Sequence, residues 1–189
     1  VWIGYAFALN LSWRIIWAFI GGRYSRWSAF LPFRKGYLKE TRDYITGFTS
    51  GHPNQYLGHN PLGRLSVTLI ISLLLVQAVT GLVLAGTDIY YPPLGSWIAN
   101  WIAAPGIDPA TLIPYSKELY DEESYKAMRS FREPFITIHY YVFYTLLIFI
   151  VLHIFAVVIT ELKEGVNLVS AMFSGKKILT KPPEDEGRN

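Results

Sequence analysis

The chain has 189 residues, of which 51% are apolar and only 16% are charged. This balance excludes a disordered or fibrous protein and lies well below the charged fraction of about 25% that is typical of soluble domains. The net charge of +3 gives no reason to expect nucleic-acid binding. Because the sequence contains no cysteine, disulfides, thiolate metal sites and covalent haem attachment are excluded as well.

Three long apolar segments follow one another along the chain. The first covers about residues 1–20 and is apolar apart from Asn10 and Arg14. The second, residues 65–87, has no charged residue, and the third, residues 135–160, has two histidines as its only ionisable groups. Each can cross a hydrocarbon core of ~30 Å, which takes roughly 20 helical residues. The sequence therefore predicts an all-α transmembrane helical bundle.

The loops between these segments differ in positive charge. Residues 21–61 carry six Lys and Arg, whereas residues 89–134 carry four. Since Lys and Arg accumulate in cytoplasmic loops, the first loop is predicted to be cytoplasmic and the second to lie outside. Within the outer loop, residues 115–131 are predicted to form a short surface helix. We expect residues 1–164 to form the transmembrane domain and residues 165–189 a cytoplasmic tail, which ends in a disordered PPEDEGRN segment.

Two histidines, His139 and His153, lie within the third apolar segment. Fourteen helical residues at 100° each turn through about 1400°, which is about 40° short of four full turns. Both imidazoles therefore project from one face, about 21 Å apart along the axis. Ionisable side chains inside a membrane helix are costly and mark a functional site by default. This spacing suits axial ligands of two b-type haems, one in each half of the bilayer.

Other roles for the two histidines stay open at this point. Either of them can simply hydrogen-bond to a neighbouring helix. A proton relay would usually add a carboxylate at membrane depth, and the three apolar segments contain none. A zinc or di-iron site would need ligands within a few Å of one another. Haem ligation is the hypothesis that the pattern favours.

Two further positions are candidates for contact with a haem. Ala78, Gly81 and Ala85 form one stripe of small residues on the second segment, which either admits a flat macrocycle or lets two helices pack closely. Arg14 must extend to the cytoplasmic side or pair with an anion, and a haem propionate is such an anion. Gly81 and Arg14 are therefore candidate haem-binding residues besides the two histidines.

Three features of the sequence have counterparts in one protein family. The segment RIIWAFIGGRYSR at residues 14–26 is similar to the cytoplasmic end of that family's second helix. The segment GHNPLG at residues 58–63 is similar to the turn that opens the third helix, and the pair His139 and His153 matches the fourth. On these features the chain resembles the bacterial membrane cytochromes b, which are cytochrome b561-like and include the cytochrome b subunit of membrane-bound nickel-iron hydrogenases.

The resemblance implies a multi-pass protein of the bacterial inner membrane, folded as a four-helix bundle with two haems b. Three of the four spanning helices lie in this chain. In that pattern His139 ligates the outer haem and His153 the inner one. The opposing ligands of the family come from its first helix and from the outer end of its second, so we expect a further spanning helix before Val1. His52 and His59 are interpreted as surface or turn residues.

The function that the resemblance implies is electron transfer between an outer redox partner and membrane quinone, by a subunit that is not an enzyme in its own right. A hydrogenase is the first choice of partner. A formate dehydrogenase, a thiosulfate reductase or a soluble c-type cytochrome stays open. The alternatives are a haem-free membrane anchor for a periplasmic protein and a transporter, which the lack of intramembrane carboxylates disfavours.

Overall fold

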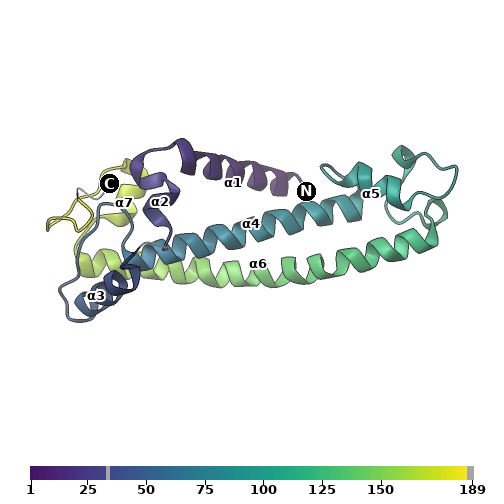
Figure 1. Cartoon of the computed structure of the whole chain (residues 1–189). Helices are drawn as coiled ribbons and strands as arrows, with labels where there is room; N and C mark the ends of the chain where they lie inside the picture. The colour runs from purple at the N-terminus through teal and green to yellow at the C-terminus, as the bar shows by residue number, and fades with distance from the viewer. Residues whose placement is uncertain (33–34, 187–189) are drawn as a thin grey trace. The chain divides into compact units, whose positions relative to one another are not determined.

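The computed structural model describes residues 1–32 and 35–186, and residues 33–34 and 187–189 lie outside the described part. Three long helices correspond to the three apolar segments: α1 (Trp2–Ile20), α4 (Pro61–Ile89) and α6 (Glu122–Glu164). The shorter α-helices are α2 (Trp27–Phe30), α3 (Tyr37–Thr49), α5 (Gly95–Ile102) and α7 (Leu168–Ser174) (Figure 1). Among the described residues the only strand-like pairing is one bridge between Ala103 and Tyr120. The prediction of an all-α fold is confirmed.

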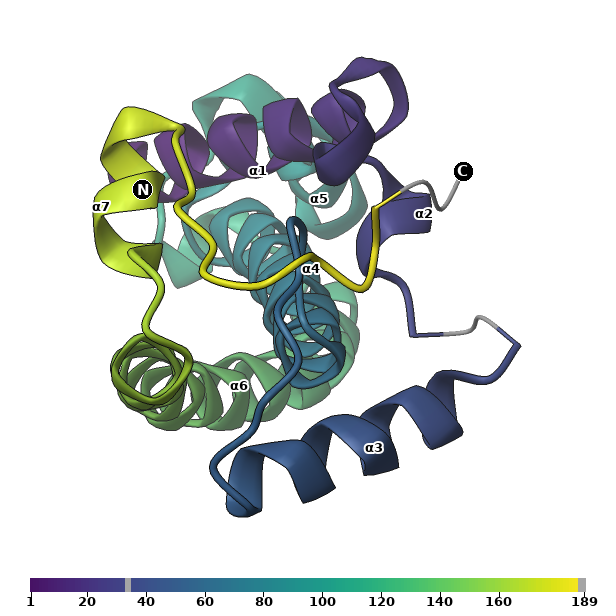
Figure 2. The same cartoon turned by 90° about the vertical axis from the view of Figure 1, so that its left-hand side faces the viewer.

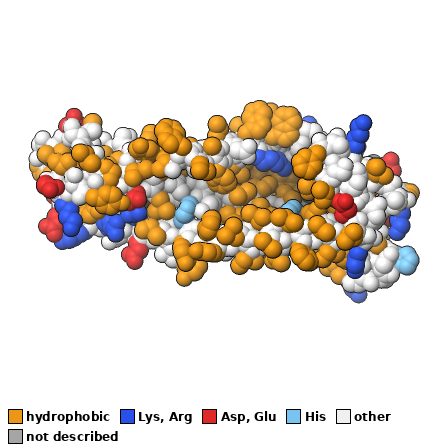
Figure 3. Space-filling view, turned by 180° about the vertical axis from the view of Figure 1, so that it is seen from behind, with side chains coloured by type: hydrophobic (Ala, Val, Ile, Leu, Met, Phe, Trp, Pro, Cys, Tyr) orange, Lys and Arg blue, Asp and Glu red, His pale blue; other side chains and the backbone are white. Residues whose placement is uncertain are grey.

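The long helices expose apolar side chains over most of their length. α1, α4 and α6 are each long and apolar enough to cross a membrane, and at most 17% of the most apolar window of any of them is buried inside the structure. Figure 3 shows hydrophobic side chains covering the middle of these helices, with charged side chains gathered towards their ends. So much continuous apolar surface is matched by lipid and not by water. The chain is a multi-pass helical membrane protein.

Helix α6 is longer than the sequence predicts. The expected surface helix at residues 115–131 is not a separate element, because α6 begins at Glu122 and continues through Pro134 into the apolar span. The carboxylate of Asp121 caps its start by accepting a hydrogen bond from the Ser124 amide at 2.8 Å. Phe131 packs on Phe135 with ring centroids 5.2 Å apart. This contact holds the helix together across the proline, which removes one backbone hydrogen bond.

The chain divides into two compact units. One comprises residues 1–12 and 73–146, and the other comprises residues 13–72 and 147–189. In the first unit α5 packs on the start of α6, where Ile98, Ile102 and Met128 are almost completely buried. In each unit α4 and α6 lie side by side and run in opposite directions (Figure 1).

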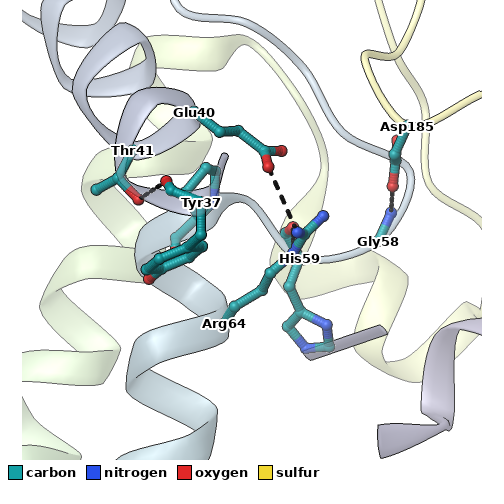
Figure 4. A network of polar contacts seen from close by, with 8 residues as sticks. Tyr37, Glu40, Thr41, Gly58, His59, Arg64 and Asp185 are labelled. Atoms are coloured by element: carbon teal, nitrogen blue, oxygen red, sulfur yellow. Dashed lines mark hydrogen bonds and ion pairs between the residues drawn. The ribbon is translucent and has the colours of Figure 1, made fainter. Parts of the chain in front are cut away.

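In the second unit α3 crosses the ends of α4 and α6 (Figure 2). The hydroxyl of Tyr44 on α3 donates to the Glu164 carboxylate at 2.7 Å, and the Asn60 amide donates to Tyr44 at 2.8 Å. Glu40 on the same helix forms an ion pair with the buried Arg64 at the start of α4, at 3.6 Å (Figure 4). These contacts fix the polar loop that precedes α4.

The end of the chain packs against this loop, and the prediction that PPEDEGRN is disordered is wrong for the described residues up to Glu186. The Asp185 carboxylate accepts hydrogen bonds from the amides of Leu57 at 2.6 Å and Gly58 at 2.8 Å. Its composition suggested disorder, but buried polar groups on the loop give the segment specific partners. The backbone carbonyl of Gln55 accepts from the Glu184 amide at 2.9 Å, and the buried Gln55 side chain binds Thr180 and Lys181 just before the segment.

We expect the Gln55→Ala substitution to lower the stability of this unit. The Gln55 amide donates to the Glu164 carbonyl at 2.7 Å and the Thr180 hydroxyl at 2.8 Å, and it accepts from the amides of Thr180 at 2.9 Å and Lys181 at 3.0 Å. Each buried group left unpaired costs about 1–3 kcal/mol. The midpoint of thermal unfolding in detergent should fall, and trypsin should cleave the Lys177–Ile178 bond in the same segment faster. Asn100→Ala, which removes one exposed bond within α5, should change neither quantity.

Candidate cofactor site

His139 projects from α6 towards α4 and is held there by two side chains. Its Nδ1 lies 2.8 Å from the Thr80 hydroxyl, and its Nε2 lies 3.0 Å from the Gln77 amide nitrogen. Gln77 and Thr80 are three residues apart on α4 and therefore share a face of that helix. The imidazole is half-buried and fixed in orientation through both ring nitrogens.

Gly81 makes the approach of His139 to α4 possible. A Cβ atom added at Gly81 would lie 3.2 Å from His139 Cε1, closer than nearly all real Cβ contacts. Because glycine has no Cβ atom, position 81 leaves room for the imidazole. The contact brings together two of the four predicted site residues.

A cavity of about 580 Å³ adjoins this imidazole within the first unit. Gln77, Asp88 and His139 contribute polar or ionisable side chains to a lining that is otherwise mostly apolar. The small residues Gly4, Ala78, Gly81 and Ala85 also line it. The volume lies within the roughly 300–1,000 Å³ of small-molecule and cofactor pockets.

The residues of this cavity fit a haem. A b-type haem needs an imidazole for its iron and apolar walls for its ring, and the cavity offers both. The Gln77 side-chain oxygen is buried and has no hydrogen-bond partner in the described part of the chain, so the polar part of the lining is not fully satisfied by the protein. Both the imidazole and the orphaned oxygen belong to a cavity large enough for a bound group.

His153 occupies an equivalent position in the second unit. Its Nδ1 lies 2.9 Å from the hydroxyl of Ser66 on α4, and its side chain is half-buried. Within residues 1–32 and 35–186, no group of three or more His, Asp or Glu side chains comes together as a metal site. The zinc or di-iron alternative therefore has no ligand cluster here, and each histidine acts with a neighbour from α4.

The end of the second unit that the loop charges predict to be cytoplasmic gathers nitrogen-bearing side chains around the buried Phe30. The Arg14 guanidinium lies 5.3 Å from the Phe30 ring centroid, and one of its nitrogens donates to the Ser25 carbonyl at 3.3 Å. The rings of Trp27 and His59 lie 5.2 and 6.5 Å from that of Phe30. Trp27 Nε1 and His59 Nδ1 are buried without hydrogen-bond partners among the described residues. Arg14 thus lies beside two unsatisfied nitrogens.

His59 is a turn residue, as predicted, but its ring is not directed to the surface. His59 does lie in the turn before α4, but its ring turns away from the Glu40–Arg64 ion pair and contacts Phe30 (Figure 4). Burial lowers the pKa of His59 from its ordinary value, and nearby positive charges act in the same direction. No pattern in the sequence indicates this orientation, because a histidine in a turn can point either way. His52 is exposed, as predicted.

Taken together, three apolar spans and an imidazole at a cavity between helices define a helical membrane protein with a cavity whose lining fits a planar cofactor. Residues 1–175 match the sequence model of the prokaryotic cytochrome b561 family, and the chain belongs to that family. No solved structure matches the chain.

Several curated proteins are similar to this chain. A probable Ni/Fe-hydrogenase B-type cytochrome subunit of Rhizobium leguminosarum bv. viciae is 27% identical over 183 residues, which cover 93% of this chain and 65% of that protein. The proteins of the same name from Bradyrhizobium diazoefficiens and Cupriavidus necator are 27% and 26% identical, over 92% and 90% of this chain. The chain spans 62–65% of the length of these three relatives.

Proposed function

We propose that this chain is part of a membrane-bound haem b subunit that transfers electrons and is not itself an enzyme. The observation that carries the proposal is the cavity beside His139, with Gly81 leaving room for the imidazole. A haem bound there accepts and releases one electron at a time. The protein would supply the axial imidazole, the apolar walls and the exclusion of water. Membership of the cytochrome b561 family supports the same cofactor.

The proposal includes a second haem, held by His153 in the second unit. The support is the similar environment of the two imidazoles, each of which has its Nδ1 within 2.9 Å of a hydroxyl on α4. In this scheme Arg14, and the unpaired nitrogens of Trp27 and His59 beside it, would face the propionates of the inner haem. Propionates are anions that guanidinium and N–H donors stabilise.

The redox partner that we propose is a hydrogenase on the outer face of the bacterial inner membrane, with quinone as the electron carrier in the lipid phase. The relatives' names support the hydrogenase, since they describe hydrogenase-associated cytochrome subunits. A periplasmic c-type cytochrome is the other partner to test. In membranes, hydrogen gas should reduce the haem only when the hydrogenase is present.

The direct test of the cofactor is a pyridine haemochrome assay on the native subunit purified in detergent. We expect about two haems b per subunit and a dithionite-reduced spectrum of low-spin haem. A purified subunit that contains no haem, yet still retains a periplasmic protein at the membrane, would support the haem-free anchor instead.

We expect Arg14→Leu to lower the midpoint potential of the inner haem. Removal of a nearby cation disfavours the reduced form, which carries one more electron. A potentiometric titration of the native subunit measures the effect. Arg14→Lys keeps the charge and should stay close to the wild type. An unchanged titration in Arg14→Leu would show that the guanidinium serves only the Ser25 carbonyl and the lipid headgroups.

A further inference from the structure

Two hydroxyl groups of α4 face the two histidines of α6. The Thr80 hydroxyl lies 2.8 Å from His139 Nδ1, and the Ser66 hydroxyl lies 2.9 Å from His153 Nδ1. Fourteen residues separate Ser66 from Thr80, and fourteen separate His139 from His153. Because antiparallel helices rise equally per residue, this equal spacing lets one helix serve both imidazoles in the same way.

The hydrogen bonds of Thr80 determine which nitrogen of His139 carries the proton. A hydroxyl has one hydrogen to donate, and Thr80 directs it back to its own helix, where the Val76 carbonyl oxygen lies 2.7 Å away. The Thr80 oxygen is then the acceptor of the hydrogen on His139 Nδ1. In neutral imidazole the other nitrogen, Nε2, keeps its lone pair. The Gln77 amide, which donates to Nε2 at 3.0 Å, agrees with this assignment.

From this geometry we propose that Thr80 and Ser66 are positioning residues for the two axial histidines. Each hydroxyl accepts the Nδ1 hydrogen of its histidine and fixes the rotation of the ring. Nε2, which the Gln77 amide contacts at His139 in this structure, is then the nitrogen whose lone pair would bind iron. The inference rests on the proposed haem function. Partners of this kind raise the basicity of a metal-binding imidazole, and their loss typically costs about 10–100-fold in metal affinity or activity.

A hydroxyl suits this role at membrane depth better than a carboxylate does. A carboxylate would accept the same hydrogen bond more strongly, but a charge inside the hydrocarbon region is expensive. A hydroxyl carries no charge, and the hydrogen of the Thr80 hydroxyl is satisfied by the Val76 carbonyl of its own helix. The three apolar segments contain no Asp or Glu, so the two hydroxyls supply the acceptors that carboxylates often supply in soluble metal sites.

The chain offers a control that matches Thr80 closely. Thr87 lies seven residues further along α4 and is 2% exposed, against 3% for Thr80. Its hydroxyl donates to the Val83 carbonyl at 2.9 Å, as that of Thr80 does to Val76 at 2.7 Å. The Thr80 hydroxyl contacts His139, whereas the hydrogen bonds of the Thr87 hydroxyl in the described part of the chain are to carbonyls of its own helix. If Thr80 only satisfied its own helix, replacing either threonine with valine would have the same effect.

The test uses the native subunit with Thr80→Val, Thr80→Ser, Ser66→Ala and the control Thr87→Val. Haem content, the two midpoint potentials and the electron paramagnetic resonance of the low-spin haems are measured for each. Thr80→Val should raise the potential of one haem, because a less basic ligand stabilises the ferric form less, or reduce its affinity about 10–100-fold. Ser66→Ala should affect the other haem. Thr80→Ser and Thr87→Val should match the wild type.

Two results would overturn the positioning roles. One is a haem-loaded Thr80→Val subunit with the potentials and spectrum of Thr87→Val. The other is a Thr80→Ser subunit that behaves as Thr80→Val does, which would assign the effect to packing of the methyl group. If Thr80→Val fails to accumulate in membranes, Ser66→Ala gives the same comparison with the loss of one oxygen, and unchanged potentials there overturn the proposal. A wild-type subunit without haem would instead contradict the proposed function itself.

Discussion

The single substitutions His139→Leu and His153→Leu should each remove about one haem from the native subunit. Leucine keeps apolar volume in the span but offers iron no nitrogen, so the corresponding haem loses one axial ligand. The two histidines have separate neighbours on α4, Thr80 and Ser66, so each single variant should keep the other haem. Haem is counted as pyridine haemochrome per mole of subunit.

The matched control is His52→Leu, which removes an exposed imidazole whose Nδ1 lies 3.0 Å from the Ser50 carbonyl in the same loop. This variant should keep both haems. If His139→Leu and His153→Leu both retained full haem content, neither histidine would be an axial ligand and the proposed function would lose its main support.

Enlarging the side chain at position 81 should weaken the haem that His139 binds. A methyl group at Gly81 would lie 3.2 Å from His139 Cε1, so Gly81→Ala must displace the imidazole by a few tenths of an ångström. Overpacking of this kind costs about 1–3 kcal/mol, or roughly a five- to 150-fold loss of affinity. The bulkier Gly81→Leu should lose this haem entirely. Haem titration of the apoprotein measures both effects.

Gly4→Ala provides the comparison for Gly81→Ala. Gly4 lines the same cavity, but a Cβ atom added there meets no other atom within 4 Å. The Gly4→Ala subunit should therefore bind haem nearly as the wild type does. Equal haem affinity in the two alanine variants would show that the small residue at position 81 serves helix packing alone.

The sequence predicted the features that depend on composition and helical period. The three spans follow from hydropathy, and the contact of both His139 and His153 with one neighbouring helix follows from their spacing. Their partners on α4 could not be chosen in this way. The second apolar segment contains several hydroxyl residues, and only the alignment of α4 with α6 selects Thr80 and Ser66 from them.

Features that depend on contacts distant in sequence were predicted less well. The inward orientation of His59 depends on the position of Phe30. The ordered conformation of the segment around Asp185 depends on hydrogen bonds from the Leu57 and Gly58 amides. Neither contact leaves a periodic pattern. Composition alone predicted disorder wrongly for the segment around Asp185, because the backbone of the loop at residues 55–58 gives it specific hydrogen-bond partners.

The ion pair of Asp88 and Arg132, at 3.0 Å, has a consequence for the proposed electron transfer. Charged side chains of this kind mark the boundary between water and hydrocarbon. His139 lies seven residues further along α6 than Arg132, which corresponds to about 10 Å of helix. His139 would therefore lie only about two helical turns beneath the membrane surface that we predict to be the outer one. In the proposed function, a partner protein resting on that surface would reach the haem at His139 without entering the bilayer.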